Sequence, residues 1–319
     1  MKRKWIYSFA FLIFIFTHIN AQKQTPVFKV IPLGTEGGLN ESNLSAYMVA
    51  PVASNNFVCL DAGTLYTGIN KAIANGLFHK TATEIIRQNI KGYCISHPHF
   101  DHVAGLLINS PSDTNKIIYA TKFCLDRIEQ YEFTWQTWAN FGDAGDKPTL
   151  NKYHYAELKE DTEVPIAGTD MFVTAFLLSH GNPYQSTAFL VRKDSSYLLY
   201  FGDTGADTIE HSQHLQHVWQ TIAPLVMKHQ LKAIFLECSY PNEQPEKQLF
   251  GHLTPKLLME EMKRLSILCN NYSIKNVPLV ITHIKPEANN ERKIMEQVNA
   301  GNILHLKIAF PQQGKLLLF

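Results

Sequence analysis

Short apolar runs recur along the chain, and many of them end at glycine, aspartate or histidine. Runs of this length between turn residues predict buried β-strands. We expect strands at residues 27–33, 46–50, 57–60, 90–96, 117–120, 172–178, 187–191, 197–201, 233–237, 279–282 and 303–309. Helical spacing of apolar residues is found at 69–75, 83–89, 102–107, 254–268 and 287–299. Strands that alternate with helices predict an α/β fold. Since no linker or repeat interrupts residues 22–319, we expect them to form a single domain.

Polar clusters follow these strands at the points where the apolar runs stop. They are Asp61, residues 97–102, His180, Asp203 and His283. Strand ends from distant parts of a chain can meet at one edge of a sheet, where α/β folds build their sites. The pattern therefore predicts one site assembled from these side chains.

The N-terminus has a different pattern. Lys2, Arg3 and Lys4 precede an uncharged, mostly apolar run over residues 5–16, and Ala21 offers a small residue for cleavage. This layout predicts a signal peptide at residues 1–21 and a periplasmic or secreted mature chain. The alternative is an uncleaved membrane anchor, but the run is shorter than the roughly 20 residues that span a bilayer. We expect no stable membrane anchor after cleavage.

Composition narrows the range of partners. The chain has 319 residues, 45% hydrophobic and 18% charged, which is typical of a globular protein. With 29 basic and 28 acidic residues the net charge is +1, so a nucleic-acid partner is not expected. Five cysteines form no CxxC motif, which argues against a cysteine zinc site. Cys59, Cys94 and Cys238 lie in apolar runs and are interpreted as small buried residues, although one disulfide stays open.

The segment HPHFDH, residues 97–102, concentrates ligating side chains. Imidazole and carboxylate groups suit zinc and related divalent ions. Because residues two apart in an extended segment point the same way, His97 and His99 can bind one ion. The turn into the following helix directs Asp101 and His102 toward a second point. Such a cluster suits two ions about 3.5–4 Å apart.

Three later residues fit the same centre. Asp203 is placed to bridge the two ions, His180 to complete the first ligand set, and His283 to complete the second. Each histidine taken alone could be an ordinary buried or surface imidazole. The joint pattern favours ligands.

The complete set, HxHxDH with a later His, Asp and His, resembles the metallo-β-lactamase fold, an αββα sandwich of two mixed β-sheets flanked by helices. Longer segments resemble the class II cyclic-nucleotide phosphodiesterases. These are LGTEGGLNESNLSAYMV (33–49), HPHFDHVAGLLINSP (97–111), LSHG (178–181), YFGDTGAD (200–207), LECSYPNEQPEKQLFGHLTP (236–255) and THIKP (282–286). One departure is Phe100, where the family pattern leads us to expect Leu; its side chain is not a ligand.

The resemblance implies hydrolysis of cAMP and/or cGMP to the nucleoside 5′-monophosphate by a hydroxide that bridges two divalent ions. Zinc is the expected metal, with manganese or iron as alternatives. Asp101 is expected to bind metal and orient the nucleophile. His252, in GHLTP, is expected to donate to the phosphate and to act as general acid to the leaving oxygen. Its alternative is a noncatalytic residue just before a helix, since Thr254 and Pro255 resemble an N-cap and first helical residue.

Further residues are expected to support or to line this centre. Asp61 either holds a ligand histidine by its other ring nitrogen or caps a loop. Asn43 and Ser45 are expected to line the pocket. Trp135, Trp138 and Phe141 could stack on a nucleobase, although such clusters also occur in cores. Glu237 and Ser239 lie near the GHLTP motif without a derivable role. His211, His214 and His217 recur every third residue, which favours a solvated helix face over a metal site.

Other functions are weaker fits. Another hydrolase of the same fold, acting on a lactone, thioester or β-lactam, does not require His252. A noncatalytic cyclic-nucleotide-binding protein does not require a full metal set. A tRNA-processing nuclease fits neither export nor the near-neutral charge. Base preference is left open, and so is a homodimer.

Overall fold

The computed structural model describes residues 25–270 and 274–319. The expected signal peptide, residues 1–21, lies outside the described residues. Within those residues, no helix is both long enough and apolar enough to cross a membrane. All five cysteines are buried and free, as expected for Cys59, Cys94 and Cys238.

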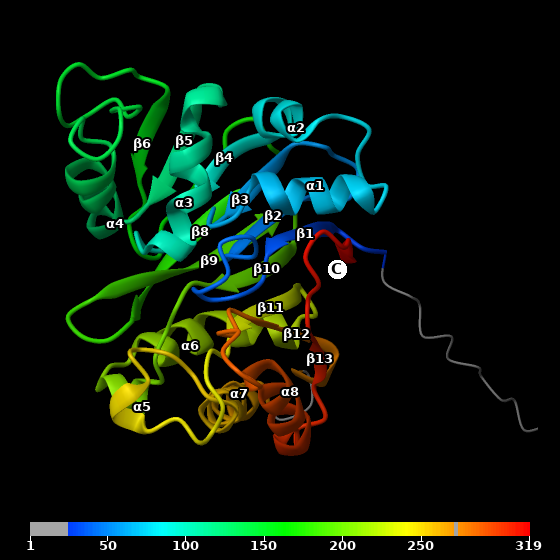
Figure 1. Cartoon of the computed structure of the whole chain (residues 1–319). Helices are drawn as coiled ribbons and strands as arrows, with labels where there is room; N and C mark the ends of the chain where they lie inside the picture. The colour runs from blue at the N-terminus through cyan, green and yellow to red at the C-terminus, as the bar shows by residue number, and fades with distance from the viewer. Residues whose placement is uncertain (1–24, 271–273) are drawn as a thin grey trace, which may run out of the picture.

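Two seven-stranded mixed sheets form the centre of the fold (Figure 1). The first has the order β14-β1-β2-β3-β4-β5-β6, with β1 Phe28–Gly34, β2 Ala46–Pro51, β3 Phe57–Leu60, β4 Ile90–Cys94, β5 Lys116–Ala120, β6 Tyr153–Glu157 and β14 Leu317–Leu318. The second has the order β13-β12-β11-β10-β9-β8-β7, with β7 Glu163–Pro165, β8 Phe172–Ser179, β9 Gln185–Lys193, β10 Ser196–Phe201, β11 Leu231–Glu237, β12 Pro278–Thr282 and β13 Lys307–Ala309.

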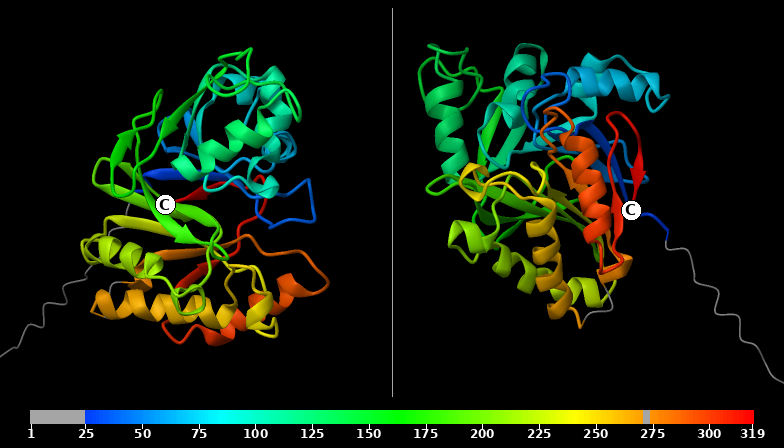
Figure 2. Two further views of the ribbon diagram at one scale, coloured as in Figure 1. Left: turned by 90° about the vertical axis from the view of Figure 1, so that its left-hand side faces the viewer. Right: turned by 60° about the horizontal axis from the view of Figure 1, so that its bottom comes forward.

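Helices cover the outer face of each sheet, as the two further views in Figure 2 also show. The first sheet carries α1 Tyr66–Ala74, α2 Ala82–Gln88, α3 Phe100–Asn109 and α4 Lys122–Arg127; the second carries α5 Asp207–Glu210, α6 His214–Met227, α7 Pro255–Leu268 and α8 Asn290–Gly301. Short 3-10 segments and one π-helix, Ile128–Glu132, complete the elements. The layers are therefore helix, sheet, sheet, helix.

Three apolar cores match these layers. The core between the sheets includes Tyr47, Phe189, Tyr200 and Phe235. Separate clusters fill the spaces between each sheet and its helices. Because central strands bury both faces, they are continuously apolar rather than alternating, as in β2 and β3, whose residues are all buried.

Parallel pairing brings the functional strand ends to a common edge. In the first sheet β3, β4 and β5 pair in parallel, and in the second sheet β10, β11 and β12 do so. Parallel neighbours end on the same side of a sheet, so the loops after β3, β4, β10, β11 and β12 gather there. The turn after β8 joins them, through the contact of His180 with His99.

The expected elements were largely found, with differences at several ends. β3 matches its expected bounds and α7 begins at Pro255 with Thr254 as N-cap, as expected. β4 ends at Cys94 rather than residue 96, and β13 begins at residue 307 rather than 303. The strand β6 and the short strands β7 and β14 were not expected.

The prediction that three histidines share one helical face was wrong for the first of them. His211 adopts a left-handed conformation (φ 53°) after α5 and lies outside α6, which begins at His214. His217 contacts the carboxylate of Asp161 at 2.9 Å. No metal-ligand group was found around these histidines in the described part of the chain.

Candidate metal centre

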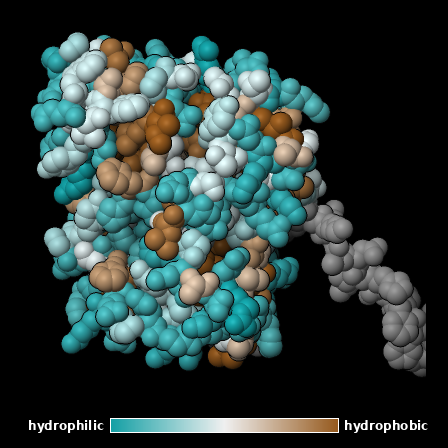
Figure 3. Space-filling view, viewed as in Figure 1, coloured by the Kyte–Doolittle hydropathy of each residue, from teal (hydrophilic) through white to brown (hydrophobic). Residues whose placement is uncertain are grey.

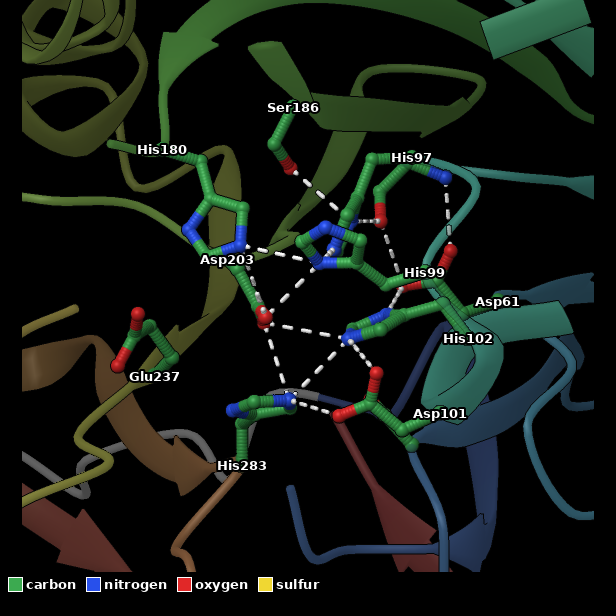
Figure 4. A network of polar contacts seen from close by, with 12 residues as sticks. Asp61, His97, His99, Asp101, His102, His180, Ser186, Asp203, Glu237 and His283 are labelled. Atoms are coloured by element: carbon green, nitrogen blue, oxygen red, sulfur yellow. Dashed lines mark hydrogen bonds and ion pairs between the residues drawn. The ribbon is translucent and has the colours of Figure 1, made fainter. Parts of the chain in front are cut away.

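The strand-end residues from both sheets converge on one point (Figure 4). Residues 97–102 follow β4, His180 follows β8, Asp203 follows β10 and His283 follows β12. Two groups of four residues have ligand atoms within 4.8 Å of one another; they are His97, His99, His180 and Asp203, and Asp101, His102, Asp203 and His283. The chain therefore brings together all seven residues that the sequence analysis proposed as ligands.

The first group points four ligand atoms inward. His99 Nδ1 lies 3.0 Å from His97 Nε2 and 3.2 Å from His180 Nε2. Asp203 Oδ2 lies 3.6 Å from His97 Nε2 and 3.7 Å from His180 Nε2. A proton on His99 Nδ1 could form a hydrogen bond to only one of these two histidine nitrogens. At least one of the two contacts therefore brings nitrogen lone pairs together without a hydrogen atom between them. Convergent lone pairs of this kind suit a cation.

The second group has the same character. His283 Nε2 lies 3.1 Å from His102 Nε2 and 3.2 Å from Asp101 Oδ2. Asp203 Oδ1 lies 3.3 Å from His102 Nε2 and 3.2 Å from His283 Nε2. Each carboxylate oxygen of Asp203 therefore faces one group, which is the arrangement of a bridging ligand. Asp203 Oδ1 is buried and accepts no hydrogen bond from the described residues, so its acceptor capacity is available to a cation.

The electrostatics favour neutral His97 and His180 beside an ionised Asp203. At His102 burial opposes protonation, but the carboxylates of Asp203 and Asp61 outweigh it and raise the pKa well above its usual value. Burial, assisted by the neighbouring His102, lowers the pKa of His97 well below its usual range. Burial also lowers the pKa of His180 to about 4. Burial opposes ionisation of Asp203, but His283 and His102 outweigh it and hold its pKa well below the ordinary value. Metal ligands must be neutral imidazoles and ionised carboxylates, because a cation competes with protons for the same lone pairs.

Asp61 orients His102 from the outer side. Asp61 Oδ2 accepts hydrogen bonds from His102 Nδ1 at 2.8 Å, Tyr200 Oη at 2.7 Å and Ser96 Oγ at 2.8 Å. Its other oxygen accepts from the backbone N–H of Ser96 at 2.7 Å. A carboxylate bonded to Nδ1 directs Nε2 of the same ring toward the centre. Of the two expectations for Asp61, this geometry corresponds to holding a histidine.

The other rings are held in similar ways. His180 Nδ1 donates to Gly251 O at 2.9 Å, and His97 Nδ1 lies 3.0 Å from Ser96 Oγ. His283 Nδ1 lies 2.9 Å from Ser239 Oγ. In each case Nδ1 faces a protein oxygen and Nε2 faces the centre. His99 is reversed, with Nδ1 inward, and its ring stacks on Tyr184 with 4.5 Å between centroids.

His252 lies at the edge of both ligand groups. Its Nδ1 is 3.9 Å from Asp203 Oδ2, and its ring centroid is 4.9 Å from that of His180 and 5.3 Å from that of His283. His252 Nδ1 donates to Glu237 Oε1 at 2.8 Å. His252 thus lies outside both groups of four, but together with Glu237 and His283 it forms a third group whose ligand atoms lie within 4.8 Å of one another.

Glu237 and Ser239 were missed as functional candidates by sequence reasoning. Ser239 Oγ donates to Glu237 Oε2 at 2.8 Å and contacts His283 Nδ1, so one carboxylate supports both His252 and His283. Glu237 is fully buried. Burial opposes its ionisation, yet the charge and hydrogen bond of His252 lower its pKa. Its position at the end of β11, like that of Asp203 after β10, was the available signal.

Tyr184 and Lys285 were also missed. Tyr184 follows a short turn after β8, so no periodicity marks it, and Phe123 packs edge-on against its ring at 5.1 Å. Lys285 lies in THIKP two residues after His283, and its ammonium lies 5.9 Å from the ring centroid of Tyr240. Neither residue type is a habitual metal ligand, which is why a search for ligands passed over both.

The residues expected to line the pocket lie at different distances from the centre. Ser45 Oγ lies 3.1 Å from Tyr200 Oη, and Asn43 is bonded to Thr35, so both lie in the loop that approaches the centre. Trp138 Nε1 donates to Ser110 Oγ beyond the far end of α3, whose ten residues separate it from the metal ligands by about 15 Å.

The other two aromatics are also engaged away from the centre. Phe141 is 8% exposed and packs against Phe133 in the core of the first helix layer. Trp135 Nε1 donates to Pro148 O. The contacts of the three aromatics therefore do not bring them to the metal ligands.

Solved structures of similar shape share this architecture. The crystal structure of unliganded yeast PDE1 superposes with a TM-score of 0.82 at 22% identity, covering 92% of this chain and 100% of that one. The metallo-β-lactamase fold protein YhfI from Bacillus subtilis superposes with a TM-score of 0.61 at 14% identity, covering 92% and 99%. The fold is thus the metallo-β-lactamase fold, as the sequence resemblance implied.

Relatives in sequence extend over almost the whole chain. A 3′,5′-cyclic-nucleotide phosphodiesterase from Aliivibrio fischeri is 37% identical, covering 93% of this chain and 94% of its own. A probable 3′,5′-cyclic-nucleotide phosphodiesterase from Yersinia pestis is 34% identical over 91% and 89%. The family described as class II cAMP phosphodiesterases matches residues 73–314. The chain therefore belongs to the class II cAMP phosphodiesterase family.

Proposed function

We propose that this protein hydrolyses the 3′,5′-cyclic phosphodiester of cAMP and/or cGMP to the nucleoside 5′-monophosphate. The observation that carries the proposal is the position of His252. It is held by Glu237 beside the two ligand groups that share Asp203. Family membership supports a phosphodiester substrate. Hydrolysis of a lactone, thioester or β-lactam in the same fold does not require this additional histidine.

The ligand set fits two divalent cations. His97, His99 and His180 would hold one, Asp101, His102 and His283 the other, and Asp203 both. Histidine with carboxylate ligands favours zinc, and also accepts manganese or iron. When bound, such ions neutralise phosphate charge and lower the pKa of water, which supplies a nucleophile near pH 7. The buried, unbonded Asp203 Oδ1 supports this fit.

The contact of His252 with Glu237 supports a role as proton donor. With Nδ1 bonded to Glu237, its Nε2 is the nitrogen left for substrate, and the carboxylate stabilises a protonated ring. In the reaction, a water oxygen bonds to phosphorus and the bond from phosphorus to the 3′-oxygen breaks. The proton of His252 passes to the 3′-oxygen, and the proton that the attacking water loses returns to His252 through solvent. Asp101, at 18% side-chain exposure, is the more accessible of the two carboxylates in the ligand set, which supports a role in orienting the attacking water.

The mature chain is proposed to act outside the cytoplasm, in the periplasm or after secretion. The N-terminal pattern of three basic residues, an apolar run and a small residue supports this. Mass spectrometry of the protein recovered from cells would find Gln22 at the N-terminus. An intact Met1 in the recovered protein would contradict it.

The test is direct. Purified protein loaded with zinc is incubated with cAMP and with cGMP, and products are followed by chromatography, beside a chelated sample and a His252→Ala variant. We expect metal-dependent release of the 5′-monophosphate and a variant slowed by roughly 100-fold or more. Absence of turnover of both nucleotides by fully loaded protein would refute the proposal.

A further inference from the structure

Lys285 places a cation beside the metal ligands. It is half-buried, and its backbone N–H donates to Ser239 O at 3.2 Å, which fixes the segment after His283. A methyl group built on Gly38 would lie 3.8 Å from Lys285 Nζ and 3.9 Å from Asp101 Oδ2. The ammonium and a ligand carboxylate therefore border the same small space, and Gly38 leaves that space open.

This ammonium has no carboxylate partner. In residues 25–270 and 274–319, no carboxylate lies within 4 Å of Lys285 Nζ; what distinguishes this lysine is its position beside the ligand carboxylate of Asp101. Its contact is the ring of Tyr240, whose other neighbour is His252 at 5.7 Å between centroids. One tyrosine thus separates the two groups, ammonium and imidazole, that can donate to an anion at this centre.

The chemistry of the substrate supplies the missing partner. A phosphodiester carries one negative charge on two non-bridging oxygens. An ammonium that is half-buried, fixed at its backbone and without a carboxylate forms a stronger hydrogen bond to such an oxygen than a solvated lysine does. Neutral esters and lactones offer no charged oxygen to it.

We propose that Lys285 binds a non-bridging phosphate oxygen on the Asp101 side of the centre and so selects anionic phosphate esters. The role rests on the proposed function only for the identity of the full substrate, because the phosphate group alone engages the lysine. Gly38 shares in it by leaving the space open. Tyr240 places the ammonium by lying beneath it.

The first measurement is phosphate binding. Inorganic phosphate is titrated calorimetrically into zinc-loaded wild type, Lys285→Met, Lys285→Arg and the control Lys256→Met, which removes an exposed lysine of α7. Lys285→Met is expected to weaken binding about 10- to 100-fold, the loss typical of one charge-assisted hydrogen bond. Lys285→Arg should retain most of the affinity, and Lys256→Met all of it. Zinc content, measured alongside, should stay constant.

The second measurement separates this inference from the proposed function. KM and kcat for cAMP and cGMP are measured in the same four proteins, and Lys285→Met is expected chiefly to raise KM. Wild type that binds phosphate through Lys285 but hydrolyses neither nucleotide would refute the proposed function alone. Unchanged phosphate affinity in Lys285→Met, or no binding of phosphate by wild type, would refute the role of Lys285.

Discussion

Glu237 Oε1 accepts a hydrogen bond of 2.8 Å from His252 Nδ1, and both groups are buried at the end of β11 and the start of the GHLTP segment. The pair sets the ring orientation of the one histidine near the centre that lies outside both ligand groups. Because Glu237 also reaches His283 through Ser239, the substrate-directed histidine and a metal ligand share one support.

Glu237→Gln is expected to lower kcat for cyclic nucleotides by roughly 10- to 100-fold, because an amide neither fixes nor charges the His252 ring as a carboxylate does. The discriminating substrate is bis(4-nitrophenyl) phosphate, whose phenolate leaves without a proton. Its hydrolysis should fall much less.

Glu243→Gln is the matched control, since Glu243 is exposed and bonds only to Gln297 among the described residues. An equal loss on both substrates in Glu237→Gln would show that the residue supports the fold or the metal rather than the proton donor.

Asp203→Asn is expected to reduce bound zinc from two ions toward one or none, because the bridging charge of both ligand groups is lost. Metal analysis after gel filtration measures this directly. Asp161→Asn, which removes a half-exposed carboxylate paired with His217, should keep both ions. Retention of two ions in Asp203→Asn would contradict a bridging role.

Gly37→Ala is expected to disturb His283, because a Cβ at residue 37 would lie 2.3 Å from Cε1 of that ring. The ring must move, and we expect activity to fall about 100-fold, as for a displacement of about 1 Å at a reacting centre. Gly76→Ala is the control, since nothing lies within 4 Å of its Cβ. That control should lose only about 1 kcal/mol of stability, from its positive φ of 78°.

Tyr184→Ala should weaken the hold on His99, because the stacked ring contact is lost. A contact of this kind contributes about 0.5–1.5 kcal/mol, which corresponds to roughly a two- to tenfold drop in zinc affinity. Competition with a chelating dye measures it. Tyr184→Phe keeps the ring and should match wild type; a defect as large as that of Tyr184→Ala would assign the effect to the hydroxyl group.

Glu261, which lies outside the metal centre, makes the free energy of unfolding depend on pH. It lies on α7, is 1% exposed, and accepts from Trp219 Nε1 at 2.8 Å; burial raises its pKa. Because the folded pKa exceeds the unfolded one, its contribution is fully present below the unfolded pKa and is lost as pH rises through the folded value. The melting temperature of Glu261→Gln, compared with that of wild type at the same pH, should therefore increase as the pH is raised from 4.5 to 8. A difference that is constant over this range would contradict the assignment.

The fold could be predicted from sequence where apolar runs are long and end sharply. β3 has the expected bounds because Asn56 and Asp61 flank four apolar residues. β7 and β14 have three and two residues, and strands this short form only because a neighbouring strand pairs with them. The repeat of His211, His214 and His217 has helical spacing, but the left-handed His211 ends α5 and breaks the face.

The convergence of the seven candidate ligands could be predicted, because metal chemistry restricts ligands to a few residue types, and these stand at strand ends. The supporting residues could not. Glu237 acts through His252, fifteen positions away, and Tyr184 through His99, so their roles depend on tertiary contacts. Trp138 and Phe141 were proposed for substrate stacking on aromatic composition, and their observed contacts lie elsewhere: Trp138 is bonded beyond the far end of α3, and Phe141 lies in the core.

Each cation position draws ligands from both sheets. His97, His99, Asp101 and His102 follow a strand of the first sheet, whereas His180, Asp203 and His283 follow strands of the second. Neither half of the chain holds a complete set. Ions bound there would link the two sheets, and their binding free energy would oppose separation of the two halves of the chain. A chain whose two sheets have not packed together therefore has neither group of four candidate ligands in place.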